Sequence, residues 1–147
     1  MMNKQIDEIK ETLVELARSW EERHGRRYYC DVAPENIVAA ARALFEKCRL
    51  RLSTATAVDL RGSVEILYHF SVDAEGAVVS LRVSLPKECL EVGSLAPFMK
   101  AAEWIEREIH EMLGVEFVGH PDPRRLLLSD VWPEGNYPLR REGEVQT

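Results

Sequence analysis

The clearest candidate for metal chemistry is the pair His110-Glu111, which matches the first half of the H-E-x-x-H motif of zinc proteases. That motif lies on a helix and places two His side chains on one face, where both bind the same ion. The second His would fall at position 114, and that residue is Gly114. The spacing therefore excludes this kind of zinc site.

The cysteines do not suggest a metal site either. Cys30, Cys48 and Cys89 are widely spaced and include no Cys-x-x-Cys pair, so a zinc or iron–sulfur site built within this chain is not expected. We expect three reduced cysteines that are at least partly buried. The sequence also lacks G-x-S-x-G, P-loop and G-x-G-x-x-G motifs, and it predicts no cofactor held by this chain.

Three consecutive charged residues, Glu106-Arg107-Glu108, allow two interpretations. On a helix they point about 100° apart. They could lie on a solvated helix end with i,i+4 pairs such as Glu103 with Arg107. Alternatively, one carboxylate turns inward and meets an Arg of the segment that follows, since Arg binds carboxylates through two hydrogen bonds. The available arginines are Arg124, Arg125, Arg140 and Arg141. Such a contact would fix an irregular segment in place and suits subunit assembly better than catalysis.

These charges belong to a predicted helix from about Pro97 to Leu113. Ser94 is a suitable N-cap, and Pro97 is favourable within the first turn. Gly114 is expected just past the end of the helix, where the backbone turns into a left-handed conformation. Residues 115–118 read as a short strand.

Two helices and a strand are predicted near the N-terminus. Residues 4–22 carry apolar side chains at alternating spacings of three and four, which is typical of an amphipathic helix. Gly25 marks its expected end. Residues 27–32 read as a strand, and Pro34 is expected to begin a second helix that extends to about Lys47.

The middle of the chain predicts an antiparallel sheet. Residues 50–60, 64–72 and 77–85 alternate between the two faces of a strand, and turn-forming residues separate them at 61–63 and 73–76. Strands joined by tight turns form an antiparallel meander, and its apolar face requires a layer of helices. The predicted fold class is α+β.

Residues 119–147 show no predicted helix or strand, although they are too apolar for a solvated tail. The large apolar side chains here are Leu126, Leu127, Leu128, Val131, Trp132, Tyr137 and Leu139. We therefore predict an α+β domain over 1–118 and an extended C-terminal arm over 119–147. The arm must lie on its own domain or on a partner subunit.

Composition narrows the function classes further. The 147 residues are 46% hydrophobic and 30% charged, with a net charge of −6, which disfavours nucleic-acid binding. No apolar stretch is long enough to span a membrane. The first residues lack the apolar core of a secretory signal. The cytosol is the expected compartment.

A set of charged, His and apolar residues at characteristic spacings, which we call the constrained run, extends from the predicted helix into the arm. It consists of Glu106-Arg107-Glu108, Glu111, Met112-Leu113, His120, Arg124 and Leu126-Leu127. This pattern resembles the C-terminal signature of the 30 kDa-type subunit of respiratory NADH:quinone oxidoreductase (complex I), a family shared with membrane-bound energy-converting NiFe hydrogenases. Elements outside the run also resemble the family: Trp104, Asp130-x-Trp132 and Pro138-Leu139-Arg140. The resemblance is strong over 104–141 and diffuse before that.

The resemblance implies a subunit without cofactors in the peripheral, cytoplasmic arm of a membrane complex. Its implied partners are the catalytic large subunit and the small iron–sulfur subunit, which hold the iron–sulfur clusters and, in hydrogenases, the NiFe centre. Contact with the membrane is indirect, and no nucleic acid is involved. The resemblance also implies a set of residues that anchor the arm or contact partners. These are Trp104, Glu106, Arg107, Glu108, His120, Asp122, Arg124, Arg125, Trp132, Tyr137, Leu139 and Arg140.

Some departures from the family pattern bear on the type of complex. Pro123 stands where Leu is common, and Glu111 replaces the more frequent Asp. The gap between Trp132 and Pro138 is longer than in NADH-dehydrogenase members, and the usual aromatic residue near the end is missing. These features favour a hydrogenase-type or ferredoxin-linked complex, with the 30 kDa-type subunit of complex I as the alternative.

A small standalone enzyme is a further alternative. It would use Glu108 or Glu111 with His120 as acid and base. The absence of a nucleophile or cofactor motif argues against it, and no activity is expected from the isolated chain.

Overall fold

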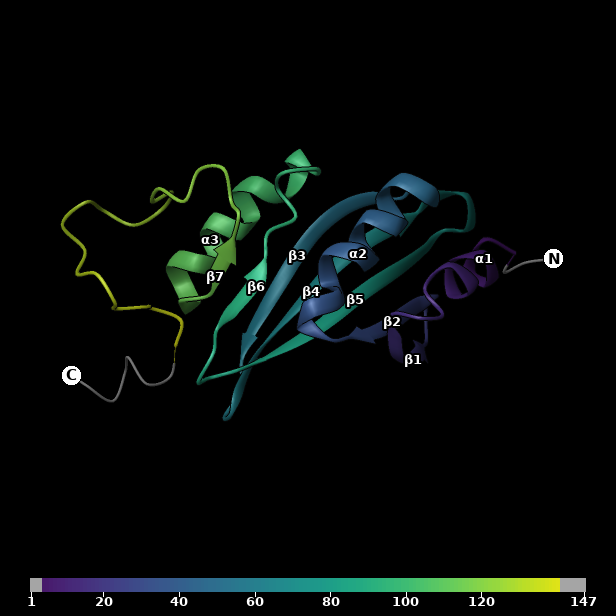
Figure 1. The fold of residues 1–147 in the computed structure, drawn as a ribbon, viewed down its shortest axis with the longest axis horizontal. Coiled ribbons are helices and arrows are strands. Elements are labelled where there is room, and N and C mark those ends of the chain that lie inside the picture. The colour runs from purple at the N-terminus through teal and green to yellow at the C-terminus, as the bar shows by residue number, and fades with distance from the viewer. Residues whose placement is uncertain (1–3, 141–147) are drawn as a thin grey trace.

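The computed structural model describes residues 4–140 and confirms the predicted α+β class (Figure 1). The main sheet has five strands in the order β1-β2-β5-β4-β3. They are β1 (Ala17–Arg23), β2 (Arg27–Val32), β3 (Arg51–Asp59), β4 (Ser63–Val72) and β5 (Ala77–Pro86). The three predicted central strands form the expected antiparallel meander, β3-β4-β5. The meander is extended by β2, which pairs parallel to β5, a pairing that the sequence did not predict.

The N-terminal helix is shorter than predicted. Helix α1 covers Lys4–Thr12, and the second half of the expected helix is strand β1. Ile6, Ile9 and Leu13 are buried. The later apolar side chains of the predicted helix, Leu16 and Trp20, pack against the core from the residue before β1 and from β1 itself. Gly25 does not end a helix. It lies with Arg26 in the turn between β1 and β2, where both residues have positive φ (85° and 60°).

Helices cover one face of the sheet (Figure 1). The segment from Pro34 to Lys47 is helical as predicted: a 3₁₀ turn η1 (Pro34–Asn36), α2 (Ile37–Arg42) and a π-helical turn η2 (Ala43–Lys47). The alternate residues of β4 and β5 that face these helices form the core. Its largest fully buried side chains include Tyr68 and Phe70.

The opposite face of the sheet carries a polar network on β1, β2 and β5, which we call the open-face network. Arg82 donates from Nε to Asp31 at 2.5 Å and from Nη2 to Glu21 at 3.3 Å. Its guanidinium also lies 5.4 Å from the ring centre of Tyr29. The three charged side chains remain 20–41% exposed.

A second, smaller unit follows the meander. Strands β6 (Glu91–Gly93) and β7 (Glu116–Val118) pair in parallel, and α3 (Glu103–Leu113) connects them after a 3₁₀ turn η4 (Lys100–Ala102). The helix begins later than predicted, and Ser94 does not cap it, because its hydroxyl serves another contact described below. Gly114 follows the helix with φ 80°, as predicted. None of the helices within residues 4–140 has the length and apolar character needed to cross a membrane.

Candidate subunit-docking site

The centre of the candidate site is Glu106, which is fully buried on the inner side of α3. Its Oε1 accepts a hydrogen bond from the Ser94 hydroxyl at 2.6 Å. Its Oε2 accepts from the Leu95 N–H at 2.9 Å and from the Tyr68 hydroxyl at 3.2 Å. Burial raises the pKa of Glu106, and these three donors offset part of that rise. Glu106 thereby joins α3 to the sheet and to the segment after β6.

His120 connects this centre to the arm. Its Nε2 donates to the Glu103 carbonyl at 2.9 Å, and its Nδ1 accepts from the Asp122 N–H at 3.0 Å. These partners correspond to a neutral imidazole with the proton on Nε2. The Nε2 atom lies 3.9 Å from Glu106 Oε1, and the side chain is only 3% exposed. The start of the arm is therefore fixed against α3.

Two further side chains of α3 bind the backbone of the arm. Arg107 donates from Nε to the Arg124 carbonyl at 2.8 Å and from Nη2 to the Arg125 carbonyl at 2.7 Å. Glu111 accepts the N–H groups of Leu126 and, at 2.8 Å, Leu127. The helix thus satisfies two carbonyls and two amides of a segment that has no secondary structure of its own. We call the contacts from His120 to Leu127 the first anchor.

The structure does not show the contact between Arg124 and a carboxylate of the helix that one of the two interpretations allowed. Its guanidinium forms a two-bond pair with Asp122 of the same loop, at 2.7 and 2.9 Å. Arg107, the cation of the helix, lies 3.7 Å from the same carboxylate. A carboxylate does turn inward, but its donors are Ser94, Leu95 and Tyr68. The arm is held through its backbone. Arg107 of the helix binds two of its carbonyls, and Glu111 of the helix binds two of its amides.

A second anchor holds the other end of the arm at the C-terminus of α3. The Leu139 N–H donates to the Met112 carbonyl at 3.0 Å, and Arg140 Nη1 donates to the Leu113 carbonyl at 3.1 Å. The ring of Tyr137 covers Gly114 so closely that a Cβ there would lie 2.6 Å from it. The described part of the arm is therefore a loop tied to one helix at both ends. Residues 141–147 of the predicted arm lie outside the described residues.

The remaining predicted site residues divide by exposure. Arg125 and Trp132 lie inside the loop: Arg125 donates to the Ser129 and Trp132 carbonyls, and the Trp132 indole donates to the Asn136 carbonyl. Trp104 and Glu108 are exposed on the outer side of α3. The large exposed apolar side chains of this region are Trp104, Val118, Leu127, Val131 and Leu139. The structure thus brings together an anchored inner surface and an apolar outer surface.

Three residues of the junction were absent from the predicted set. Tyr68 comes from β4 and Ser94 from the segment after β6, so both reach Glu106 across long stretches of sequence. Glu111 belongs to the constrained run, and its place one turn after Arg107 was the signal that could have revealed it.

The geometry gives His120 and Glu111 structural roles, because the hydrogen bonds above occupy both ring nitrogens and both carboxylate oxygens. Nothing here supports their use as an acid–base pair. Residues 4–140 contain no group of three or more His, Cys, Asp or Glu side chains arranged to hold a metal ion.

Comparisons with known proteins place this geometry in a family. Residues 30–147 match the family described as respiratory-chain NADH dehydrogenase, 30 Kd subunit. The corresponding NADH-quinone oxidoreductase subunit from Geobacter sulfurreducens is 32% identical over 120 residues, which cover 78% of this chain and 73% of that protein. Hydrogenase-4 component G of Escherichia coli is 39% identical over 84 residues, or 56% of this chain, but the match spans only 15% of that protein.

Among solved structures, a chain of the membrane-bound sulfane sulfur reductase, an archaeal respiratory membrane complex, has a similar fold. The TM-score is 0.81 at 25% identity, with 95% of this chain and 85% of that chain covered. The resemblance drawn from residues 104–141 is confirmed: the chain belongs to the family of the 30 kDa subunit of respiratory-chain NADH dehydrogenase, which has hydrogenase-related members.

Proposed function

We propose that this chain is a structural subunit, without a cofactor of its own, in the peripheral arm of a membrane-bound oxidoreductase complex of the hydrogenase or ferredoxin-linked type. It packs against the catalytic large subunit, and the small iron–sulfur subunit is its second neighbour. Electron transfer and the ion translocation coupled to it belong to the assembly, on the cytoplasmic side of the membrane.

The observation that carries this proposal is the arm. An irregular segment is held at both ends by buried or half-buried polar contacts, yet Leu127, Val131 and Leu139 are 58%, 88% and 63% exposed. Anchors of this kind restrict the backbone before any partner arrives, which lowers the entropy cost of binding. Exposed apolar side chains on a preordered loop are suited to docking on another protein.

The type of complex is supported by two further observations. The longer gap between Trp132 and Pro138 resembles the pattern of the hydrogenase-type members, and the sulfane sulfur reductase chain shares the fold over 95% of this chain. The second candidate is the 30 kDa-type subunit of NADH:quinone oxidoreductase. It is favoured by the relative from Geobacter sulfurreducens, of which this chain spans 73%.

The experiment is purification of the intact complex through a tag on this chain, followed by identification of the large subunit. We expect a large subunit with two Cys-x-x-Cys pairs, the ligand set of a NiFe centre. A large subunit without these pairs would favour the complex I alternative or another acceptor-type complex. Recovery of the chain alone from gently solubilised membranes would contradict the structural-subunit role.

A matched pair of variants tests the arm itself. Gly114→Ala places a methyl group against the Tyr137 ring, whereas Gly119→Ala has open space around the new methyl group. Both glycines have positive φ (80° and 87°), so the backbone strain is similar. We expect Gly114→Ala to reduce the yield of complex at least fivefold and Gly119→Ala to leave most of it. Equal yields would contradict a role for the second anchor.

A further inference from the structure

The two outer strands of the main sheet differ in how their free edges are protected. Strand β1 carries charged side chains along its length, with the sequence ARSWEER, and its pairing is irregular between Ala17 and Ser19. Charges and irregularities of this kind prevent the edge of a sheet from pairing with other chains. The outer edge at β1 is therefore protected.

Strand β3, at the opposite edge, lacks this protection. Its one irregularity falls between Leu52 and Thr54, and from Thr54 to Asp59 each residue is in regular register with β4. Thr54–Val58 has the sequence TATAV, without a charge or a proline, and Thr54, Thr56 and Val58 are exposed. Its backbone makes no hydrogen bond to the rest of residues 4–140 outside β4. Alternate N–H and C=O groups therefore point outward without a hydrogen-bond partner among residues 4–140, and the neighbours of β3 besides β4 are α3 and η4.

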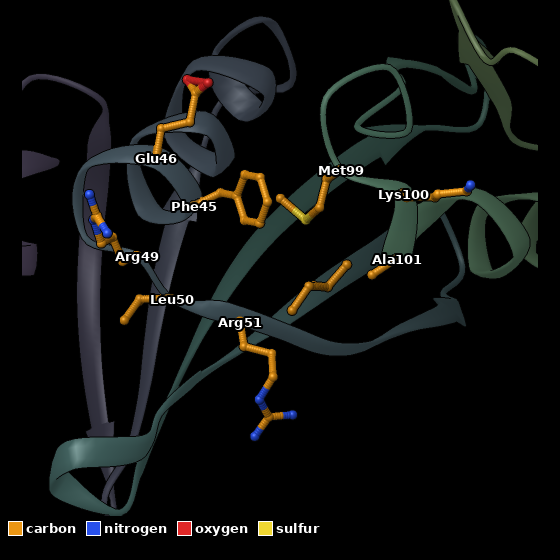
Figure 2. Close-up of a pocket in the computed structure, with 9 residues that line it drawn as sticks. Phe45, Glu46, Arg49, Leu50, Arg51, Met99, Lys100 and Ala101 are labelled. Carbon is orange, nitrogen blue, oxygen red and sulfur yellow. The ribbon is translucent and has the colours of Figure 1, made fainter.

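An apolar hollow lies at the start of the same strand (Figure 2). It has a volume of about 720 Å³ and is lined from β3 by Arg51 and Leu52, with further residues from η2, the η2–β3 link and η4. Figure 2 shows Phe45 and Met99 pointing toward one another from opposite sides. Phe45 is 38% exposed although its ring lies 6.3 Å from that of Phe98. Leu50, Leu52 and Met99 are nearly buried beneath the hollow, so a large apolar side chain from a partner would pack against the Phe45 ring.

The margin of this hollow is basic, although the whole chain has a net charge of −6. The side chains of Arg49 and Lys100 are exposed and form no hydrogen bond or ion pair within the described part of the chain. Arg49 is also held at φ 56°, an uncommon conformation for a residue with a side chain. The one acidic residue of the margin, Glu46, lies 3.9 Å from Arg42. The margin therefore complements a negatively charged group.

We propose that β3 receives an extended segment from a partner subunit, which adds a sixth strand to the sheet. This segment places a large apolar side chain on the exposed ring of Phe45 and an acidic side chain beside Arg49 and Lys100. Main-chain hydrogen bonds to Thr54–Val58 supply affinity, and the hollow and its margin supply specificity. A second copy of this chain fits less well, because its own β3 carries one acidic residue, Asp59, which is paired with Lys87.

The inference rests on the proposed function, since the segment comes from another member of the same complex. The test is hydrogen exchange at single-amide resolution, for the wild-type chain alone and within the purified complex. We expect alternate amides of Thr54–Val58 to gain at least tenfold protection in the complex, and the amides of β1 to change little. Protection of the arm, 126–139, in the same sample reports on the proposed function.

The outcomes are distinct. Protection of the arm without protection of Thr54–Val58 overturns the β3 inference and leaves the proposed function in place. If neither region gains protection, the proposed docking is itself overturned. Protection of β3 in the isolated chain, with a doubled molecular mass, would assign the edge to a second copy and also overturn the inference.

The acidic partner is tested separately by charge reversal. Arg49→Glu combined with Lys100→Glu should reduce the yield of complex at least tenfold, while the isolated chain keeps its exchange pattern because both side chains are exposed. Arg18→Glu, at the exposed surface of β1, is the control and should leave the yield within twofold. Equal yields from the double variant and the control would refute an acidic segment at this margin.

Discussion

The helix–arm junction and the open-face network both combine arginines with carboxylates, but they differ in burial and in the kind of partner. At the junction, Glu106 and Arg107 are at most 9% exposed and bind mainly backbone groups and hydroxyls. On the open face, Arg82 binds carboxylates that water can reach. A buried group that loses its partner cannot turn to water, whereas an exposed group can. The junction therefore depends much more on the identity of each residue.

The largest effect should follow from removing the Glu106 carboxylate. Glu106→Ala leaves the Ser94 hydroxyl, the Leu95 N–H and the Tyr68 hydroxyl without their acceptor in a buried site. We expect the free energy of unfolding to fall by about 3 kcal/mol, measured as a lower urea midpoint at unchanged m-value. Glu108→Ala, at the exposed position two residues on, is the control and should change little. Equal midpoints for the two variants would contradict the central role of Glu106.

The sequence predicted this contrast only in part. Alternation identified the strands of the meander, and the left-handed conformation required after a helix identified Gly114, because both signals are local. The inward carboxylate was one of two open alternatives. Its partners were not predictable, since Tyr68 and Ser94 are 38 and 12 residues away. For the same reason the parallel pairing of β2 with β5 was missed. The apolar stripe of residues 4–22 was misleading, because Leu16 and Trp20 fit a helix but pack from β1 or next to it.

Arg107 should give the next largest effect. Arg107→Ala removes two charge-assisted hydrogen bonds to the carbonyls of Arg124 and Arg125, and we expect a loss of about 2 kcal/mol. Amides of 124–127 should also exchange faster, because the first anchor opens. Arg107→Lys should restore little, since a single ammonium group cannot reproduce both bonds of the planar guanidinium. Full recovery in the Lys variant would mean that the positive charge alone holds the arm.

The pH dependence of stability should have opposite signs in the two networks. Burial raises the pKa of Glu106, so the unfolded chain ionises first as pH rises, and the contribution of Glu106 falls from about pH 4.5 up to its raised pKa. The hydrogen bond from Arg82 lowers the pKa of Asp31, so the contribution of Asp31 is present above pH 3.8 and is lost as pH falls to its lowered pKa.

Two variants separate these contributions in urea titrations between pH 3 and pH 8. Glu106→Gln should flatten the stability curve of the isolated chain above pH 4.5, and Asp31→Asn should flatten it below pH 3.8. An unchanged slope in Glu106→Gln would mean that the donors around Glu106 fully offset its burial.

The smallest effect is expected at Arg124, one of the arginines that could have paired with the helix. Its side chain is 82% exposed, and its partner Asp122 belongs to the same loop. The arm is held there by the Arg124 carbonyl, which any residue supplies, so Arg124→Ala should lower the urea midpoint of the isolated chain at pH 7 only slightly, by the small contribution of the exposed pair. The pair lowers the pKa of Asp122, and the variant should therefore lose stability less steeply below pH 3.8. A midpoint shift as large as that of Arg107→Ala would show that the exposed pair contributes to the first anchor. Buried and exposed contacts would then matter equally, and the difference in stability proposed between the helix–arm junction and the open-face network would not hold.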